Sequence, residues 1–184
     1  MILKTYKYRL YPTPSQIQKL EQTVETSRRW YNTCLEERKT AWETEKRSVG
    51  KYEQLAKVKE YRKANPYAGQ VHSHILQVVA VDVDKSFQGF FRRLEAGETP
   101  GYPRFKSSNR FDSFGLKEHG NGFKIDGRRL RISGIGRIRV RWHRPMEGKI
   151  KTVRIRRQAG KWYACFACEV DAQNLPAPGK AVGV

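Results

Sequence analysis

The stretch that decides the fold is Tyr6-Lys7-Tyr8-Arg9-Leu10-Tyr11-Pro12-Thr13-Pro14-Ser15-Gln16. Its first half alternates aromatic or aliphatic residues with basic ones, a pattern typical of a strand with one basic face. Its second half indicates a helix start, because Thr13 can cap the helix, Pro14 suits the first helical position and Gln16 completes a capping box. We therefore expect one isolated strand, over residues 1–12, followed at once by helices.

Three helical segments are expected after this start. Apolar residues recur at helical spacing at about 13–47, 51–64 and 71–96. Asn65-Pro66 ends the second segment and Gly97 closes the third. Residues 13–97 are therefore interpreted as a three-helix unit. Its last helix carries Phe87, Phe90 and Phe91, whose spacing predicts core packing.

Beyond Pro100 the apolar period changes from that of a helix to that of a strand. Five alternating segments, separated by Gly or Asp-Gly turns, are expected at 123–125, 130–132, 137–142, 150–156 and 162–170. No helical stretch interrupts them, which favours an antiparallel sheet or small barrel that the first strand joins. The predicted fold class is α+β: a small antiparallel β-barrel, residues 1–12 and 98–172, interrupted by the helical insertion 13–97.

Charge is the main functional signal. The 184 residues contain 37 Lys and Arg against 18 Asp and Glu, a formal net charge of +19. Such an excess on a chain that can build a core predicts a polyanionic partner, most often nucleic acid. No apolar run approaches about 18 residues and no signal-peptide pattern is present, which predicts a cytoplasmic protein, at the nucleoid when bound to DNA.

Arginine alternates along two predicted strands. Residues 128–157 contain twelve Lys or Arg against one acid. Arg137, Arg139 and Arg141 project to one side of their strand, and Arg154 and Arg156 repeat the pattern. Because guanidinium groups match phosphate geometry, we expect these five residues to contact a nucleic-acid backbone. The alternative is an ordinary solvated sheet face, which is disfavoured because arginine side chains without acidic partners repel one another.

Two further segments offer polar side chains with suitable chemistry. Gly101-Tyr102-Pro103-Arg104-Phe105-Lys106 is either a packed connector or a segment in which Arg104 and Lys106 bind backbone phosphates. Ser73 and Gln77 lie one helical turn apart, and a Gln side chain can pair bidentately with adenine in a major groove. A solvated Gln is the alternative.

The sequence shows no catalytic or metal-binding arrangement. Cys165 and Cys168 alternate onto opposite faces of a strand, so a structural zinc site is not expected. The four His lack ligand spacing and are predicted at the surface, while Asp82 and Asp84 diverge on a helix. We expect no catalytic residue, no metal ligand and no cofactor in this chain.

Several short segments follow one another in a distinctive order: Tyr8-Arg9-Leu10-Tyr11-Pro12, Arg28-Arg29-Trp30-Tyr31-Asn32, Lys85-Ser86-Phe87-Gln88-Gly89-Phe90-Phe91-Arg92-Arg93, Gly101-Tyr102-Pro103-Arg104-Phe105-Lys106, Leu130-Arg131-Ile132 through Gly136-Arg137-Ile138, and Gly148-Lys149-Ile150-Lys151 with Gly160-Lys161-Trp162-Tyr163. In this order the chain resembles the N-terminal part of the TnpB (OrfB) family, which is encoded by insertion sequences and comprises RNA-guided DNA endonucleases.

The resemblance implies a wedge-like barrel, split by a helical recognition insertion and followed by a RuvC-like nuclease domain that would begin within residues 173–184. The chain would then lack the nuclease active site, and Mg²⁺ would act only in the missing domain. The implied partners are a guide RNA and a double-stranded target DNA, whose motif Tyr52, Ser73 and Gln77 would read. The alternative is a stand-alone nucleic-acid-binding protein, repressor-like or RNA-binding, without a nuclease role.

Overall fold

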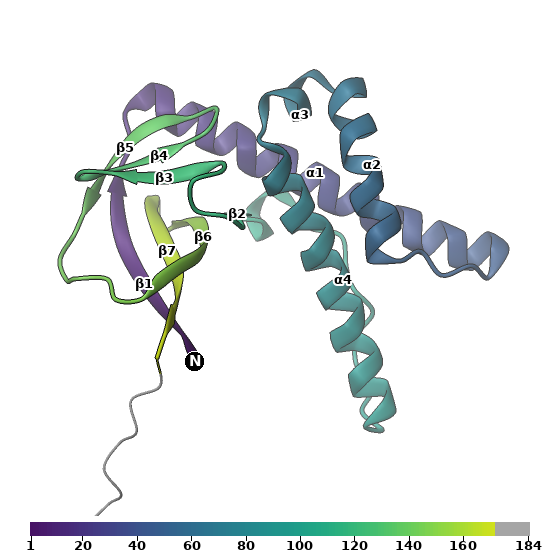
Figure 1. Ribbon diagram of the computed structural model, residues 1–184. Coiled ribbons are helices and arrows are strands. Elements are labelled where there is room, and N and C mark those ends of the chain that lie inside the picture. Colours follow the sequence, from purple (N-terminus) through teal and green to yellow (C-terminus); the bar gives the residue numbers. More distant parts are fainter. Residues whose placement is uncertain (172–184) are drawn as a thin grey trace, which may run out of the picture.

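The computed structural model describes residues 1–171, so the predicted start of a RuvC-like domain within residues 173–184 lies outside the described part. Its elements are β1 (Ile2–Tyr11), α1 (Pro14–Glu45), α2 (Lys51–Ala64), α3 (Pro66–Gln70), α4 (Ser73–Glu95), a 3-10 turn (Ser108–Arg110), β2 (Ser113–Leu116), β3 (Phe123–Asp126), β4 (Arg129–Ile132), β5 (Gly136–Arg141), β6 (Lys149–Gln158) and β7 (Lys161–Val170). The strands gather on one side and the helices project from the other (Figure 1).

The predicted strand-to-helix junction is confirmed. The Thr13 hydroxyl accepts a hydrogen bond from the Gln16 backbone N–H at 3.3 Å, and the Thr13 N–H donates to Gln16 Oε1 at 3.0 Å. Gln16 Nε2 also donates to the carbonyl oxygen of Arg137 at 2.9 Å. The helix start is thereby attached to β5.

The helical insertion contains a fourth, short helix that the sequence reading missed. The Asn65 side chain accepts hydrogen bonds from the N–H groups of Tyr67 and Ala68, and this cap allows α3 to begin at Pro66. The last helix begins at Ser73 rather than Val71, because Val71 is in extended conformation and His72 caps the helix. Proline ended the second helix as predicted, but it also started the next one.

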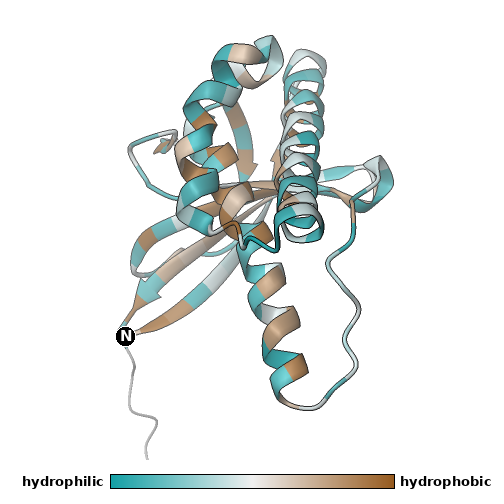
Figure 2. Cartoon of the chain, turned by 90° about the vertical axis from the view of Figure 1, so that its right-hand side faces the viewer, coloured by the Kyte–Doolittle hydropathy of each residue, from teal (hydrophilic) through white to brown (hydrophobic). Residues whose placement is uncertain are grey.

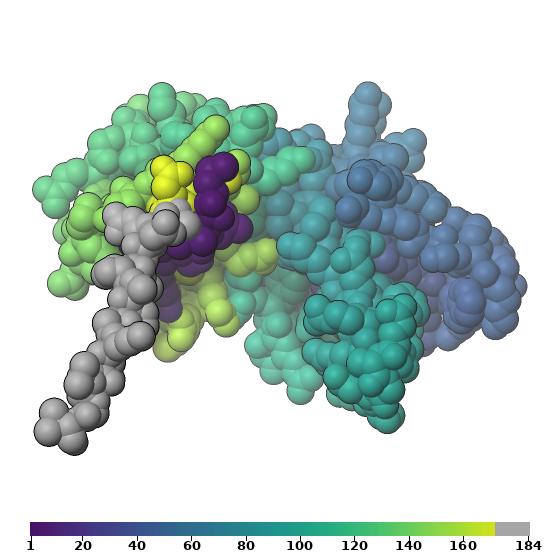
Figure 3. Space-filling view, turned by 60° about the horizontal axis from the view of Figure 1, so that its bottom comes forward, coloured from purple at the N-terminus to yellow at the C-terminus, as the bar shows by residue number. Residues whose placement is uncertain are grey.

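The seven strands form one antiparallel sheet in the order β2-β6-β7-β1-β5-β4-β3. The first strand lies in its centre, between β7 and β5, so the helices are inserted between β1 and β2 as expected. Strands β1 and β7, from opposite ends of the chain, are adjacent in Figure 3. Residues 117–122 link the two edge strands, β2 and β3, and the sheet is rolled into a nearly closed barrel. The sequence reading missed β2, which is only four residues long.

Aromatic rings fill the barrel. Tyr8 and Phe166 are buried with ring centroids 6.0 Å apart, and Trp142 stands 4.7 Å from Tyr8. The helical insertion rests on the barrel at Gly115 of β2, where a Cβ atom would lie only 2.9 Å from Cγ1 of Val78 on α4. Glycine therefore allows the close contact between helix and sheet.

One core prediction is wrong. Phe87 is buried, whereas Phe91 is 53% exposed and Phe90 is half-buried. Figure 2 shows apolar residues on the part of α4 that extends beyond the barrel. Tyr102 packs against Phe87 and Phe90 there, whereas Phe91 remains largely exposed. Helical spacing identifies the residues that share one face of a helix, but it does not show how much of that face other elements bury.

Candidate nucleic-acid interface

Cross-strand pairing places basic residues directly opposite one another on the outside of the barrel. The paired positions include Lys124 with Arg131, Arg131 with Arg137, Arg129 with Arg139, and Arg9 with Arg141. Like charges facing each other on neighbouring strands destabilise a sheet. A surface that retains four such pairs is suited to bind an anion.

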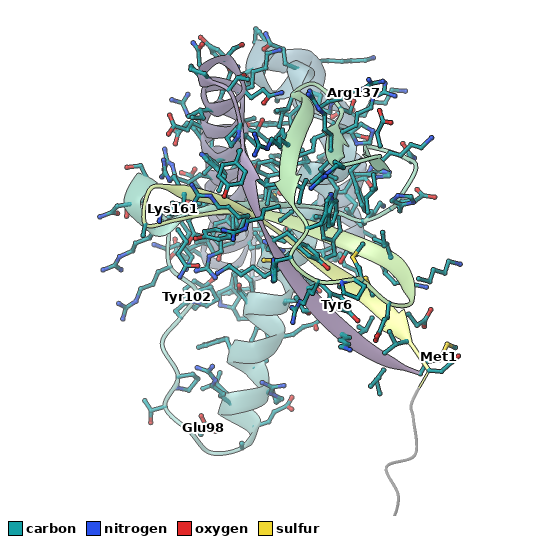
Figure 4. All side chains as sticks on the ribbon, turned by 90° about the vertical axis from the view of Figure 1, so that its left-hand side faces the viewer. Met1, Tyr6, Glu98, Tyr102, Arg137 and Lys161 are labelled. Carbon is teal, nitrogen blue, oxygen red and sulfur yellow. The ribbon has the colours of Figure 1, made fainter. Side chains whose placement is uncertain are left out.

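Only part of this charge is neutralised within the protein. Asp126 pairs with Arg137 at 2.9 Å. Among the described residues, no carboxylate lies within 4.0 Å of five other guanidinium groups, those of Arg9, Arg129, Arg131, Arg139 and Arg141. We call these five residues, together with Tyr11, the arginine face. Figure 4 looks onto this side of the barrel, where nitrogen-tipped side chains project around Arg137.

The Tyr11 ring contacts two guanidinium groups of the arginine face. The guanidinium carbons of Arg9 and Arg139 each lie 5.4 Å from the Tyr11 ring centroid, within cation–π range. A hollow of about 830 Å³ adjoins them, lined by Tyr11, Arg128, Arg129, Arg139, Val140, Arg141 and Trp142. A ring that holds two guanidinium groups beside a basic hollow can present them to phosphates.

The predicted arginines divide into two groups. Arg137, Arg139 and Arg141 are exposed on β5 with Ile138 and Val140 buried behind them, which confirms their common side. Arg154 and Arg156 lie on β6, separated from β5 by two strands.

Arg154 and Arg156 each have an acidic partner, which the sequence reading did not foresee. Arg154 is half-buried and donates to Asp82 of α4 at 2.7 Å, while Arg156 pairs with Asp112 at 3.1 Å. The expectation that acids leave these rows unbalanced is therefore wrong for both. Arg9, Arg129 and Arg131 were not selected from the sequence, because strand register, which places them opposite other arginines, is not readable there.

The segment 101–107 is packed against the helices. The Tyr102 ring centroid lies 5.5 Å from those of Phe87 and Phe90. The backbone of Lys106 is hydrogen-bonded to the side chains of Arg28 and Asn32. These contacts favour the connector interpretation, although the side chain of Arg104 is exposed.

The three expected motif readers occupy different environments. Tyr52, on the first turn of α2, is 78% exposed. Arg38 hydrogen-bonds both Gln54 and Asp84, so the start of α2 lies beside a part of α4 about three turns beyond Ser73. The structure therefore separates Tyr52 from Ser73.

Gln77 lies in a groove rather than on an open helix face. It is half-buried and lines a groove of about 310 Å³ between α4 and the barrel, together with Leu55, Lys117 and Arg154. The close seating of α4 at Gly115 turns this side of the helix toward the barrel. Leu55 is one turn from Tyr52, so Tyr52 and Gln77 are near the same groove.

The prediction that all four histidines lie at the surface is wrong for His72 and His74. His74 is buried, and its Nδ1 has no hydrogen-bond partner among the described residues. His72 is half-buried, and its ring stands 4.7 Å from that of His74. Burial lowers the pKa of both rings, and the neighbouring positive charge of Arg62 and of Lys117, respectively, lowers it further. Both rings are therefore predominantly uncharged near neutral pH.

The described residues contain no constellation for covalent or metal chemistry. No group of three or more His, Cys, Asp or Glu among them has a geometry that could hold a metal ion. Burial raises the pKa of the Cys34 thiol to about 12, which keeps it unreactive. Asp82 and Asp84 are engaged by Arg154 and Arg38. Within residues 1–171, no helix is long and apolar enough to cross a membrane.

Comparison with known proteins adds three findings. Residues 1–47 match a family model described as a helix-turn-helix domain of OrfB proteins of the IS605 type. A Streptomyces pristinaespiralis protein assigned as an RNA-guided DNA endonuclease is 30% identical over 100% of this chain and 46% of its own length. The Escherichia coli (strain K12) protein InsQ, with the same assignment, is 23% identical over 98% of this chain and 44% of its own length. The chain spans about half the length of these relatives.

A solved structure shows the same fold. The Cas12f1 chain of a complex with sgRNA and target DNA superposes with a TM-score of 0.51 at 12% identity, covering 94% of this chain and 49% of that chain. The fold is thus an α+β, wedge-like barrel with a helical insertion. These matches are to proteins of the TnpB (OrfB) family, and they support the resemblance of this chain to the N-terminal part of that family. The residues matched by the helix-turn-helix model form a strand and one long helix here, β1 and α1.

Proposed function

We propose that this chain is the guide-RNA- and target-DNA-binding N-terminal portion of a transposon-associated, RNA-guided DNA endonuclease. Its residues 1–171 supply binding and positioning rather than catalysis. The observation that carries the proposal is the arginine face, whose guanidinium groups oppose one another without carboxylate partners among the described residues. The names of the family relatives support the assignment of RNA and DNA as the polyanions.

The rows of the arginine face suit a folded RNA strand. Guanidinium groups at alternate positions of adjacent strands form a two-dimensional array, so they can follow a backbone that crosses the sheet. Such contacts are electrostatic, and they release counterions from the nucleic acid. The binding should therefore weaken steeply as salt is added.

The salt dependence of RNA binding tests this proposal. A double substitution of Arg139 and Arg141 by Gln should weaken binding to a structured RNA hairpin and flatten the plot of log affinity against log salt. The slope for B-DNA is about 0.9 per neutralised phosphate, and RNA should be of the same order. A matched control removes Arg92 and Arg93, which are exposed at the far end of α4. If the double variant behaves as the control does, the arginine face is only a solvated surface.

A stand-alone nucleic-acid-binding protein is the second candidate, since the arginine face and the absence of a catalytic cluster within residues 1–171 fit it equally well. Sequencing the RNA that co-purifies with the chain separates the two. One dominant RNA encoded next to the gene would favour the guide-binding role, whereas a diverse RNA population would favour the stand-alone role.

A further inference from the structure

A second basic hollow lies where the barrel is not closed by strand pairing. It has a volume of about 230 Å³, and its lining includes His72, Asn121, Lys124, Arg131 and Ser133. The β3–β4 hairpin forms one wall, and the loop between the two edge strands of the sheet forms another. His72, the cap of α4, reaches it from the helical side. We call this hollow the seam pocket.

Two cations of the seam pocket face each other without compensation. Lys124 and Arg131 are directly opposite on β3 and β4. Among residues 1–171 no carboxylate lies within 4.0 Å of either side chain. Glu118, on the nearby loop, accepts a hydrogen bond from Asn121 at 3.3 Å and lies 4.0 Å from Nε2 of His74. The pocket therefore carries two positive charges that an anion would relieve.

The pocket also offers neutral donors held in place by the backbone. Nδ1 of His72 accepts the His74 N–H at 3.3 Å, so the proton of the neutral His72 ring is on Nε2 and that atom is a donor. The Ser133 N–H donates to the carbonyl oxygen of Gly122 at 2.8 Å, which ties the loop to the hairpin. Gly122 has a φ of +94°, and a Cβ there would lie 3.1 Å from the His72 ring. Glycine thus lets the loop close onto the ring.

Arg131 belongs both to the seam pocket and to the arginine face, and on its other side it is paired with Arg137 of β5. The row Lys124, Arg131 and Arg137 therefore leads from the face to the start of α4. We propose that the seam pocket binds a phosphodiester phosphate of the bound nucleic acid and so guides its backbone to the N-terminal end of α4. This inference rests on the proposed nucleic-acid-binding function.

The test removes side chains of the seam pocket that lie outside the arginine face. Lys124→Gln removes one cation, and His72→Asn removes the ring donor while an Asn side chain still caps the helix. Arg93→Gln, at an exposed site on the far end of α4, is the control for loss of one charge. The probes are a fluorescent RNA hairpin and a fluorescent DNA duplex, and affinity is measured by anisotropy over a salt series. Unchanged thermal unfolding midpoints at pH 7.5 verify that both pocket variants are folded.

We expect Lys124→Gln to weaken binding of one probe and to reduce its salt slope by about 0.9, the value for one phosphate contact on B-DNA. His72→Asn should weaken the same probe with a smaller change of slope, because a neutral donor is lost. The probe that responds identifies the strand whose phosphate is bound. If both variants match Arg93→Gln with both probes, the seam pocket binds no phosphate. The same salt series on the double variant Arg139→Gln/Arg141→Gln distinguishes failure of the seam-pocket proposal from failure of the proposed function. If this double variant loses affinity and Lys124→Gln does not, only the seam-pocket proposal is overturned. If neither variant loses affinity, the proposed function is overturned as well.

Discussion

The side-chain amide of Asn32 hydrogen-bonds both backbone polar groups of Lys106. Asn32 Oδ1 accepts the Lys106 N–H at 2.8 Å, and Asn32 Nδ2 donates to the Lys106 carbonyl oxygen at 3.0 Å. Arg28, one turn earlier on α1, donates to the same carbonyl at 3.0 Å. The Asn32 side chain thus pairs with the Lys106 backbone in the way that a neighbouring strand would. It joins α1 to the segment 101–106, and both of these segments resemble motifs of the family.

Substitution of Asn32 by Ala should destabilise the protein by about 1–3 kcal/mol, because the part-buried Lys106 N–H is left without a partner. The free energy of unfolding from urea denaturation measures this loss. Gln18→Ala, at an exposed position on the same helix, is the control. Equal stability of the two variants would mean that water replaces the amide at no cost and that the connector is not held by Asn32.

Gln77→Ala should reduce discrimination between a target duplex bearing the recognised motif and a scrambled one, while RNA binding is retained. A bidentate contact to a base contributes roughly 1–3 kcal/mol of discrimination. The measurement compares both duplexes with guide-loaded wild type and variant at fixed salt. Gln88→Ala, an exposed amide on the same helix, is the control. A loss that is equal for both duplexes would make Gln77 a backbone contact, and no loss would make it a structural side chain of the groove.

Stability should fall as the pH is lowered from about 7.5 toward 5.5. Burial lowers the pKa of His72 and His74 below the ordinary histidine value of 6.5, so the unfolded chain binds more protons than the folded one in this range. The free energy of unfolding then rises with pH, and the stabilisation present above pH 6.5 is lost on acidification. Protonation of His72 also removes the acceptor that caps α4.

Thermal unfolding midpoints of wild type and His72→Asn measure this dependence, since Asn retains a cap but does not titrate in the range. The variant should lose less stability than wild type between pH 7.5 and 5.5. The Glu25 carboxyl, whose pKa the Arg28 hydrogen bond lowers to about 2, stays charged throughout and does not contribute. Parallel curves for the two proteins would assign the acid sensitivity to other groups.

No Mg²⁺-dependent DNA cleavage is expected from this chain, because phosphodiester hydrolysis by metal ions needs clustered carboxylates and the described residues contain no such cluster. The assay incubates the purified chain with supercoiled plasmid and Mg²⁺, with an EDTA-treated sample as the blank. Reproducible nicking that EDTA abolishes, and that co-elutes with the protein, would reveal a catalytic site outside the arrangement described here.

The sequence by itself determined the order and nature of most elements. The capping box at Thr13 and Gln16 marked the junction of strand and helix, and the change of apolar period after Pro100 marked the barrel. These features are local, so propensity, capping and alternation predict them. The charge of +19 likewise indicated a polyanionic partner without any knowledge of the fold. Alternation along a strand is also local, so it placed Arg137, Arg139 and Arg141 on one side of their strand.

Only the tertiary structure decided which charges are free and which surfaces are covered. Register placed Arg9 opposite Arg141, while the packing of α4 on the barrel brought Asp82 to Arg154 and turned Gln77 into a groove. The same packing buried His74, which looked like a surface residue. Register and helix placement depend on long-range pairings and on one close approach at Gly115, and local sequence encodes neither. The candidate site is therefore a property of the assembled barrel, built from residues that alternation alone could not bring together.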